Sequence, residues 1–255
     1  MKLTISPLSK IPLIYPGDNL ADIILASLHL NRVNLKDGDI LVLAQKIVSK
    51  AEGRLVNLTT VTPSKEAVDL SDRCEKDPRL VELILRESKE VLRVRPGSVI
   101  VEHRLGFICA SAGIDHSNVQ GVRGNPEEWV LLLPENPDRS ALEIRQKIEA
   151  STGTHIGVMI IDSHGRAWRI GVVGTCIGLS GLPALIDERG RKDLFGHKLK
   201  ITIVSAADEL AAAASLVMGE ASEGTPVVHV RGFPYPLRES SLQELIRPRD
   251  QDLFR

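Results

Sequence analysis

DILVLAQKIVSKAEGR, residues 39–54, is the most informative stretch of the sequence, because an apolar run passes here directly into polar and basic side chains. Residues 40–44 have the length and the apolar content of a buried strand. Gln45, Lys46 and Lys50 follow at or beyond the end of this strand, in what we expect to be a polar turn. Lysines so placed are suited to bind an anion, although isolated lysines usually remain on the solvated surface. The stretch therefore predicts a core strand with a candidate anion site at its end.

The composition is typical of an ordinary globular protein. The chain has 255 residues, of which 43% are hydrophobic and 25% charged, enough to form a substantial core. With 32 basic against 33 acidic residues and no block rich in lysine or arginine, we expect no nucleic-acid partner. The three cysteines are odd in number and lack CxxC spacing, so we expect neither a disulfide framework nor a structural zinc site.

The sequence lacks the patterns typical of export and of membrane spans. The N-terminal MKLTISPLSKIPL has neither an apolar core nor a small-residue cleavage site, which argues against a signal peptide. The longest uncharged run, residues 170–186, contains four glycines and Pro183 and is shorter than a bilayer requires. Together with the cysteine content, this favours a cytoplasmic protein with no membrane partner.

Helices and strands do not alternate regularly along the chain. We expect strands at residues 3–5, 40–44, 98–102, 107–110, 129–133, 156–161 and 227–230, the sixth of them ending at Asp162. We expect helices at residues 19–30, 63–74, 78–92, 137–150 and 206–218. Their expected N-caps are Asp18, Thr62, Asp77 and, in a capping box with Asp208, Ser205. This order predicts an α+β fold with mixed or antiparallel sheets and packed helices, over residues 1–235, followed by a polar tail or short helix over residues 236–255.

Three acidic residues, Asp115, Asp162 and Glu220, stand in short polar breaks after apolar segments. Side chains at such breaks can reach a cleft, and hard cations such as magnesium or manganese bridge carboxylate oxygens to phosphate groups. Taken singly, each residue is also an ordinary turn or element-end carboxylate. The pattern makes the three residues candidate metal ligands and leaves the other interpretation open.

Motifs of several other enzyme classes do not occur in the sequence. GxxxxGK[ST] does not occur, which excludes a P-loop, and the histidines show no HExxH spacing, so we expect most of them in loops or in solvent. The glycines of GVVGTCIGLSG, residues 171–181, do not follow GxGxxG, and we favour tight packing over a phosphate cradle. Arg166 and Trp168, in GRAWR, are suited to bind an aromatic, acidic ligand, while a structural role for the tryptophan is equally open.

Several of these segments together resemble one family. The segments are IPLIYPGDNL (11–20), VSK (48–50), AGIDHSN (112–118), IIDSHGRAWR (160–169), GVVGTCIGLSG (171–181) and ADELAAAASLVMGE (207–220). In this order they resemble the coenzyme F420-0:γ-glutamyl ligases, over roughly residues 3 to 232. The resemblance implies a ligase that uses GTP to join L-glutamate to coenzyme F420-0, a deazaflavin phosphodiester, through an acyl phosphate. Later glutamates are added in γ linkage.

The resemblance also implies the residues of the site. It implies Asp115, Asp162 with Ser163, and Glu220 as ligands of two Mg²⁺ or Mn²⁺ ions, and it leaves a role for K⁺ open. Lys50, Asp115 and Asp162 form the implied catalytic set, and Asn118 contacts the nucleotide. The other expected nucleotide contacts are Ile11, Pro12, Leu13, Ile14, Gln45, Lys46, Met218, Gly219, Glu220, Ala221, Ser222, Glu223, Gly224 and Thr225. Two closely associated lobes, about residues 1–110 and 111–235, and a homodimer are implied as well.

The sequence departs from the family pattern at two positions. Leu105 and Ser111 stand where members commonly have a histidine and an asparagine. We expect these changes to affect contacts with the acceptor more than the nucleotide and metal chemistry. Glutamylation of another acceptor, such as a folate, and a non-catalytic module that binds a nucleotide or deazaflavin remain alternatives, and the sequence does not distinguish GTP from ATP.

Overall fold

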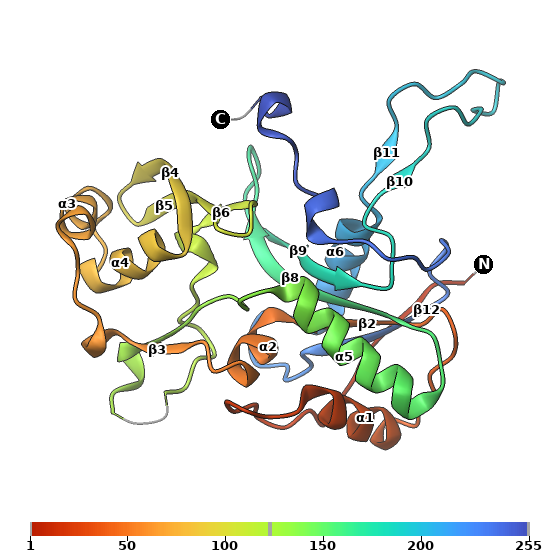
Figure 1. Ribbon diagram of the computed structural model, residues 1–255, viewed down its shortest axis with the longest axis horizontal. Coiled ribbons are helices and arrows are strands. Elements are labelled where there is room, and N and C mark those ends of the chain that lie inside the picture. The colour runs from red at the N-terminus through yellow and green to blue at the C-terminus, as the bar shows by residue number, and fades with distance from the viewer. Residues whose placement is uncertain (1, 122–123, 254–255) are drawn as a thin grey trace.

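The structure is a computed structural model that describes residues 2–121 and 124–253, and its architecture is α+β (Figure 1). Its largest sheet has five strands in the order β1-β12-β2-β8-β9. The pair β2 and β8 is parallel and the other pairs are antiparallel, which confirms the predicted class with mixed and antiparallel sheets. The five strands are β1 (Thr4–Pro7), β12 (Val227–Arg231), β2 (Ile40–Ala44), β8 (Gly157–Gly165) and β9 (Val172–Ser180).

Helices cover both faces of this sheet. Leu41 and Leu43 of β2 belong to one hydrophobic cluster and Ile40 and Val42 to another, and all four residues are fully buried. A strand covered on both faces must be apolar throughout, which explains the uninterrupted run at the start of this segment. Each such side chain stabilises the fold by about 1.5–3 kcal/mol through burial. The covering helices are α1 (Leu20–Leu30), α2 (Gln45–Ala51) and α5 (Pro137–Thr152) on one face and α6 (Ala206–Met218) on the other.

A second, three-stranded sheet packs with two helices on the other side of the molecule in Figure 1. Its antiparallel strands are β4 (Ser88–Arg95), β5 (Ser98–His103) and β6 (Ile108–Ala110), and its helices are α3 (Lys65–Cys74) and α4 (Pro78–Arg86). Two strand pairs complete the sheets: β3 (Leu55–Asn57) with β7 (Trp129–Leu131), and β10 (Ile186–Asp187) with β11 (Ile203–Val204). The short 3-10 helices are η1 (Leu58–Thr60), η2 (Ser111–Gly113), η3 (Pro126–Glu128), η4 (Leu242–Glu244) and η5 (Arg249–Gln251).

The glycines of β9 allow close packing of helices against the sheet. A Cβ atom at Gly178 would lie 2.3 Å from the Cβ of Pro137, at the start of α5. At Gly174 it would lie 2.7 Å from the carbonyl oxygen of Ala211, in the alanine run of α6. Neither contact is sterically possible, so these glycines are required for packing, as we favoured from the sequence.

The structure corrects several expected helix boundaries. The helix that starts at Pro78 ends at Arg86, and the residues that we expected to continue it form strand β4 instead. Two register shifts between β4 and β5 interrupt the alternation that would have identified this strand. Thr62 is not an N-cap, because α3 begins at Lys65 and the hydroxyl of Ser64 accepts from the amide of Ala67.

The expected N-cap of the first helix is wrong, and that of the last helix is confirmed in its position but not in its hydrogen bonding. Asn19, not Asp18, is the N-cap of α1, and Asp18 accepts a hydrogen bond from the amide of Tyr15 instead. Ser205 stands at the N-cap position of α6 but its hydroxyl donates to Asp208, and no side chain caps the helix there. The cap at Asp77 is confirmed, since this carboxylate accepts from the amide of Arg79.

Residues 236–253 pack along the body of the protein. Leu242 is buried, and its amide donates to the carboxylate of Asp138 at the start of α5. Arg249 forms an ion pair with Glu90 of β4, at 2.9 Å between Nη2 and Oε2. In the described ranges 2–121 and 124–253, no helix has both the length and the apolar content needed to cross a membrane.

Candidate functional site

A cavity of about 650 Å³ opens at the edge of the five-stranded sheet, beside the end of β2. The structure places every residue that the family resemblance implies as catalytic, nucleotide-binding or metal-binding around this cavity, whereas Arg166 and Trp168 do not line it. The implied residues come from five segments, at residues 11–14, 45–50, 115–118, 162–163 and 218–225. The structure therefore brings the predicted residues together, while their roles in binding remain predictions.

The parallel pairing of β2 with β8 explains part of this convergence. Ala44, the last residue of β2, pairs with Ile161 of β8. Gln45 and Asp162 are the next residues of the two segments, so their polar side chains meet at the same edge of the sheet. The expectation that the strand ends at Asp162 is wrong, because β8 also pairs with β9 and this pairing continues as far as Gly165.

The polar turn that we expected after β2 is instead helix α2. The helical conformation buries Ile47 and Val48 in the core, which the apolar pattern of so short a segment does not reveal. Because Lys46 and Lys50 are four residues apart, the helix presents them on one face. This face lines the cavity.

Asp115 is held at the centre of a polar network. Its Oδ2 accepts a hydrogen bond of 2.6 Å from the side-chain amide of Gln45, and its Oδ1 lies 3.4 Å from Nζ of Lys46. Burial raises the pKa of Asp115 to about 6, and the negative charge of Asp162 adds to this rise, while Lys46 and Gln45 oppose it. Two carboxylates that repel each other in a partly buried cavity favour the binding of a cation.

The two lysines hold the loop that follows Asp115. Lys46 Nζ donates to the carbonyl and hydroxyl oxygens of Ser117, at 3.2 and 2.9 Å, and Lys50 Nζ donates to the carbonyl of Asn118 at 2.8 Å. The side-chain amide of Asn118 donates in turn to the carbonyl of Ala221, 2.9 Å away in the segment after α6. Burial and the charge of Lys46 lower the pKa of Lys50. The lysines thus keep both sides of the cavity in place.

On the side of the cavity formed by β8, hydrogen bonds join the strand to the segment after α6. The hydroxyl of Ser163 donates to both carboxylate oxygens of Glu220, at 2.7 and 2.9 Å. His164 Nε2 lies 3.0 Å from Oδ2 of Asp162. His164 was not predicted from the sequence as a site residue, and its position directly after Asp162 and Ser163 was the signal that could have identified it.

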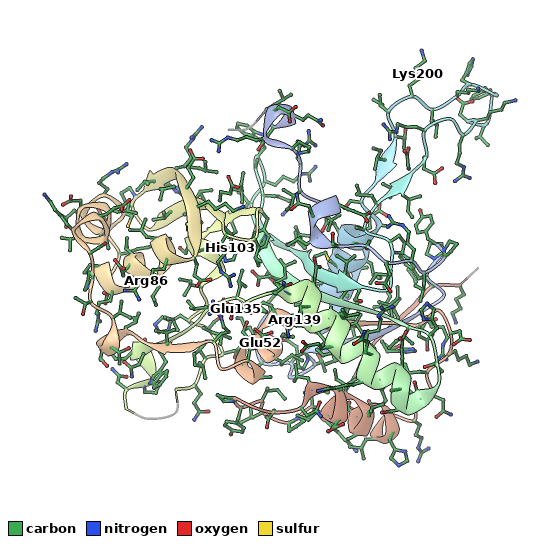
Figure 2. All side chains as sticks on the ribbon, viewed as in Figure 1. Glu52, Arg86, His103, Glu135, Arg139 and Lys200 are labelled. Carbon is green, nitrogen blue, oxygen red and sulfur yellow. The ribbon has the colours of Figure 1, made fainter. Side chains whose placement is uncertain are left out.

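The ring of His164 connects the cavity to a buried polar cluster. Phe107 lies between His164 and His103, with centroid distances of 5.2 and 5.0 Å. His103, labelled in Figure 2, is fully buried, and its Nε2 lies 3.7 Å from Oε2 of Glu87. Burial lowers the pKa of His103, which is partly offset by Glu87. The expectation that most histidines lie in loops or in solvent is confirmed, because His29, His116, His155 and His197 are exposed. The exceptions are His103, His164 and His229, which lie on strands, each beside a carboxylate.

The oxygen donors of the cavity fit a hard divalent cation. Asp115, Asp162, Ser163 and Glu220 all line it, and carboxylate and hydroxyl oxygens are the ligands that magnesium and manganese prefer. Asp115 and Asp162 repel each other, and a cation between the carboxylates would relieve this repulsion. Over the described parts of the chain, no three His, Cys, Asp or Glu side chains are already grouped as metal ligands.

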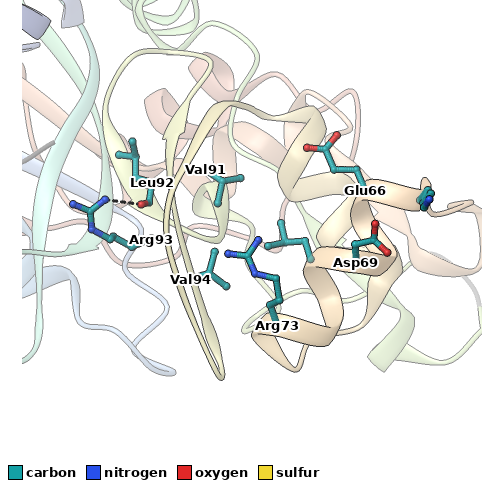
Figure 3. Close-up of a pocket in the computed structure, with 9 residues that line it drawn as sticks. Glu66, Asp69, Arg73, Val91, Leu92, Arg93 and Val94 are labelled. Carbon is teal, nitrogen blue, oxygen red and sulfur yellow. Dashed lines mark hydrogen bonds between the residues drawn. The ribbon is translucent and has the colours of Figure 1, made fainter.

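A further cavity, of about 580 Å³, lies between α3 and β4 (Figure 3). Glu66, Asp69 and Arg73 of α3 line it opposite Val91 and Val94 of β4. It contains none of the predicted site residues, and its mixed charges do not favour a particular ligand. We therefore assign the functional site to the cavity beside β2.

Comparison with known proteins decides the family. The model of the F420-0:γ-glutamyl ligase family matches residues 9–232 of the chain. The chain belongs to this family. It is 45% identical to a coenzyme F420:L-glutamate ligase of Methanothermobacter thermautotrophicus, with 100% of both chains covered. It is 46% identical to that of Methanopyrus kandleri, over 99% of this chain and 98% of the relative, and 42% identical to that of Archaeoglobus fulgidus, over 100% and 97%.

Three residues that the sequence singled out, Leu105, Ser111 and Trp168, lie outside the cavity lining. Leu105 and Ser111, where the sequence departs from the family pattern, are not among the described residues that line the cavity. Trp168 is 88% exposed, so it does not have the structural role in the core that the sequence left open. This exposed side chain belongs to the turn between β8 and β9, which starts from the cavity.

Proposed function

We propose that the chain is a GTP-dependent ligase that joins L-glutamate to coenzyme F420-0. The observation that carries the proposal is the convergence of Lys46, Lys50, Asp115 and Asp162 on one cavity in a chain of this family. The relatives described above, aligned over nearly the whole of both chains, are coenzyme F420:L-glutamate ligases.

The reaction that we propose has two steps. A carboxylate is a poor electrophile, so an oxygen of the acceptor carboxylate first attacks the γ-phosphorus of GTP, and GDP leaves. The α-amine of glutamate then attacks the carbonyl carbon of this acyl phosphate, loses a proton and expels phosphate. Further glutamates would be added in γ linkage by the same two steps.

The lysines would neutralise the charge of the phosphates. An ammonium group stabilises the negative charge that develops on a transferred phosphoryl group. Lys50 Nζ now donates to the carbonyl of Asn118, and a phosphate oxygen would replace this acceptor or share the ammonium with it. Residues 11–14 and 218–225 would form the remaining walls of the nucleotide site, since both segments line the same cavity.

Asp115, Asp162, Ser163 and Glu220 would hold the divalent ions. When bound, Mg²⁺ or Mn²⁺ neutralises phosphate charge and polarises the phosphoryl group. Gln45 and Lys46 would orient Asp115 through the contacts that they already make with it. Ser163 would orient Glu220 in the same way.

We also propose that the protein is a cytoplasmic homodimer of two-lobed subunits, as the family resemblance implies. The arm formed by β10, β11 and the loop between them supports the dimer, because it projects from the body in Figure 1 and carries exposed apolar side chains. Leu194 is 99%, Phe195 85% and Ile201 88% exposed. Apolar surface of this kind is commonly buried in an interface. Sedimentation velocity measures the mass directly, and a monomer at micromolar concentration would refute the dimer.

The function is tested by mass spectrometry of a reaction that contains the purified protein, F420-0, L-glutamate, GTP and Mn²⁺. We expect a product heavier than F420-0 by one or more glutamyl residues, with GDP released in step. If F420-0 is unchanged while a folate gains glutamate, the acceptor is wrong and the chemistry stands. If no acceptor reacts and GTP is only bound, the protein is a binding module.

A further inference from the structure

The turn between β8 and β9 carries exposed side chains that the fold does not use. It comprises residues 166–171, and in Figure 1 it projects beyond the sheet. Trp168 is 88% exposed and Ile170 fully exposed. Trp168 also has a φ of 64°, a left-handed conformation that is rare for a bulky residue. A large aromatic group is therefore presented to solvent at a cost to the fold.

This turn begins and ends at the catalytic cavity. Gly165 and Val172 pair across the two strands, and both line the cavity. The tip is three residues from either strand end, so it lies within about 10 Å of the cavity wall, at about 3.3 Å per extended residue. Asp162, which we place at the reacting groups, stands on the same strand as Gly165. A ligand that extends from the turn along β8 would reach the reaction centre.

The basic side chains of the cavity are too few to neutralise the acidic groups of the acceptor. Among the described lining residues, the ammonium groups of Lys46 and Lys50 face four carboxylates, those of Asp115, Asp162, Glu220 and Glu223. The two divalent ions that we propose would offset these four negative charges and no more. The proposed reaction needs both lysines for the triphosphate. The further acidic groups of the acceptor therefore need cations from outside this set.

Arg169 is positioned to supply such a cation. It is exposed, and within residues 2–121 and 124–253 it has no hydrogen-bond or ion-pair partner. Arg166 is less available to a ligand, because its Nη1 donates a hydrogen bond of 3.2 Å to the carbonyl of Gly171 and so helps to shape the turn. A guanidinium binds a carboxylate or phosphate with two parallel hydrogen bonds, and an indole face stacks on a planar ring. The turn thus offers both groups next to each other.

We propose that the turn of residues 166–171 binds the acceptor of the ligase reaction, with Trp168 stacked on its planar ring and Arg169 paired with one of its acidic groups. The inference rests on the proposed function, because it takes the acceptor to be a long molecule with an aromatic ring at one end and a reactive carboxylate at the other. The ring would lie at the turn and the carboxylate beside Asp162. Trp168 and Arg169 would then determine specificity for the acceptor without taking part in the chemistry.

The test compares Trp168→Ala with Trp168→Phe and with Leu216→Ala, which removes an equally exposed apolar side chain from α6. Loss of a stacking platform should raise the KM for F420-0 by about 5- to 150-fold. The kcat and the KM values for GTP and glutamate should stay within about twofold, and Trp168→Phe should retain most of the affinity. Leu216→Ala should leave the KM for F420-0 unchanged.

Arg169 is tested in the same assay. Arg169→Ala should raise the KM for F420-0 and make it less sensitive to salt, because it removes a charge pair. Arg32→Ala, at an exposed arginine after α1, is the matched control and should change neither property. An unchanged KM in both Trp168→Ala and Arg169→Ala would overturn the inference.

Two further outcomes separate this inference from the proposed function. Equilibrium dialysis of F420-0 against wild type and Trp168→Ala, without GTP, measures binding independently of turnover. If wild type binds and glutamylates F420-0 and Trp168→Ala does so equally well, only the role of the turn is wrong. If wild type does neither, both proposals fail.

If Trp168→Ala instead reduces the sedimenting mass and leaves the KM unchanged, the turn contacts a second copy of the chain and the inference is overturned.

Discussion

Replacing Glu87 by glutamine should remove about 3 kcal/mol from the free energy of unfolding at neutral pH. Both Glu87 oxygens accept hydrogen bonds of 3.0 Å from Nη2 of Arg54, and Oε2 accepts one of 2.8 Å from Nε of Arg104. Burial raises the pKa of Glu87, but His103 and the two guanidiniums outweigh it and hold the pKa at about 2, against an ordinary 4.5. We attribute most of this effect to the arginines, because His103 Nε2 at 3.7 Å is too far for a strong hydrogen bond. At about 1.4 kcal/mol for each pKa unit, the difference between these two pKa values gives the expected loss of stability of about 3 kcal/mol.

The sign of the pH dependence follows from the lowered pKa. The stabilising contribution of Glu87 is complete above the unfolded pKa of 4.5, and it is lost as the pH falls from there towards about 2. The glutamine variant lacks this contribution at every pH. The difference in stability between wild type and Glu87→Gln should therefore be largest near neutral pH and should decrease between about pH 5 and pH 2.

Urea unfolding followed by circular dichroism measures this difference across the pH range. The matched control is Glu143→Gln, since Glu143 is 56% exposed and pairs with Arg139 one helical turn away, a pair worth at most about 0.5 kcal/mol. A loss below about 1 kcal/mol for Glu87→Gln at pH 7, or a loss that does not change with pH, would refute the reasoning.

Three further substitutions test the site and the core. Lys50→Ala should lower kcat by about 100- to 1000-fold in the glutamylation assay, because it removes a group that stabilises charge in the transition state. Thermal unfolding should be unchanged, because the hydrogen bond that is lost is exposed. A loss of less than about tenfold would contradict the role of Lys50. Asp162→Ala should abolish turnover without unfolding the protein and should weaken Mn²⁺ binding in calorimetry, and retained activity would refute its assignment as a ligand. Asp39→Asn should lower the free energy of unfolding by about 3–5 kcal/mol, because Arg231 and His229 would lose a buried anionic partner, and unchanged urea unfolding would contradict this.

The parts of the fold that the sequence predicted well have local causes. Residues 40–44 form a strand that is buried on both faces, and an uninterrupted apolar run records this directly. Helix α5 follows from Pro137 at its first position and from apolar residues at helical spacing. The site residues were predicted from a resemblance to a family, and the convergence of their segments depends on the parallel pairing of β2 with β8, which no local pattern reveals.

The parts that were missed depend on contacts between distant segments. β4 was taken for the end of a helix, because its pairing with β5 contains two register shifts and so hides the alternation of a strand. The cluster of Glu87 with Arg54 and Arg104 joins residues up to 50 positions apart, and only the fold shows that these charges are buried together. The short helix α2 was read as a turn, because a segment of seven residues is too short for its periodicity to be recognised.

Isotope transfer from the acceptor to phosphate tests the proposed ligase mechanism most directly. F420-0 labelled with ¹⁸O at both oxygens of the reacting carboxylate would be incubated with the protein, GTP, L-glutamate and Mn²⁺, and both the phosphate and the glutamylated product analysed by mass spectrometry. The acyl-phosphate route predicts one ¹⁸O in the phosphate released by the first addition and one in the amide carbonyl that this addition forms. Phosphate from later additions carries no label, because their reacting carboxylates come from unlabelled glutamate. A glutamylated product formed with unlabelled phosphate would contradict the route, and unreacted F420-0 would contradict the proposed function itself.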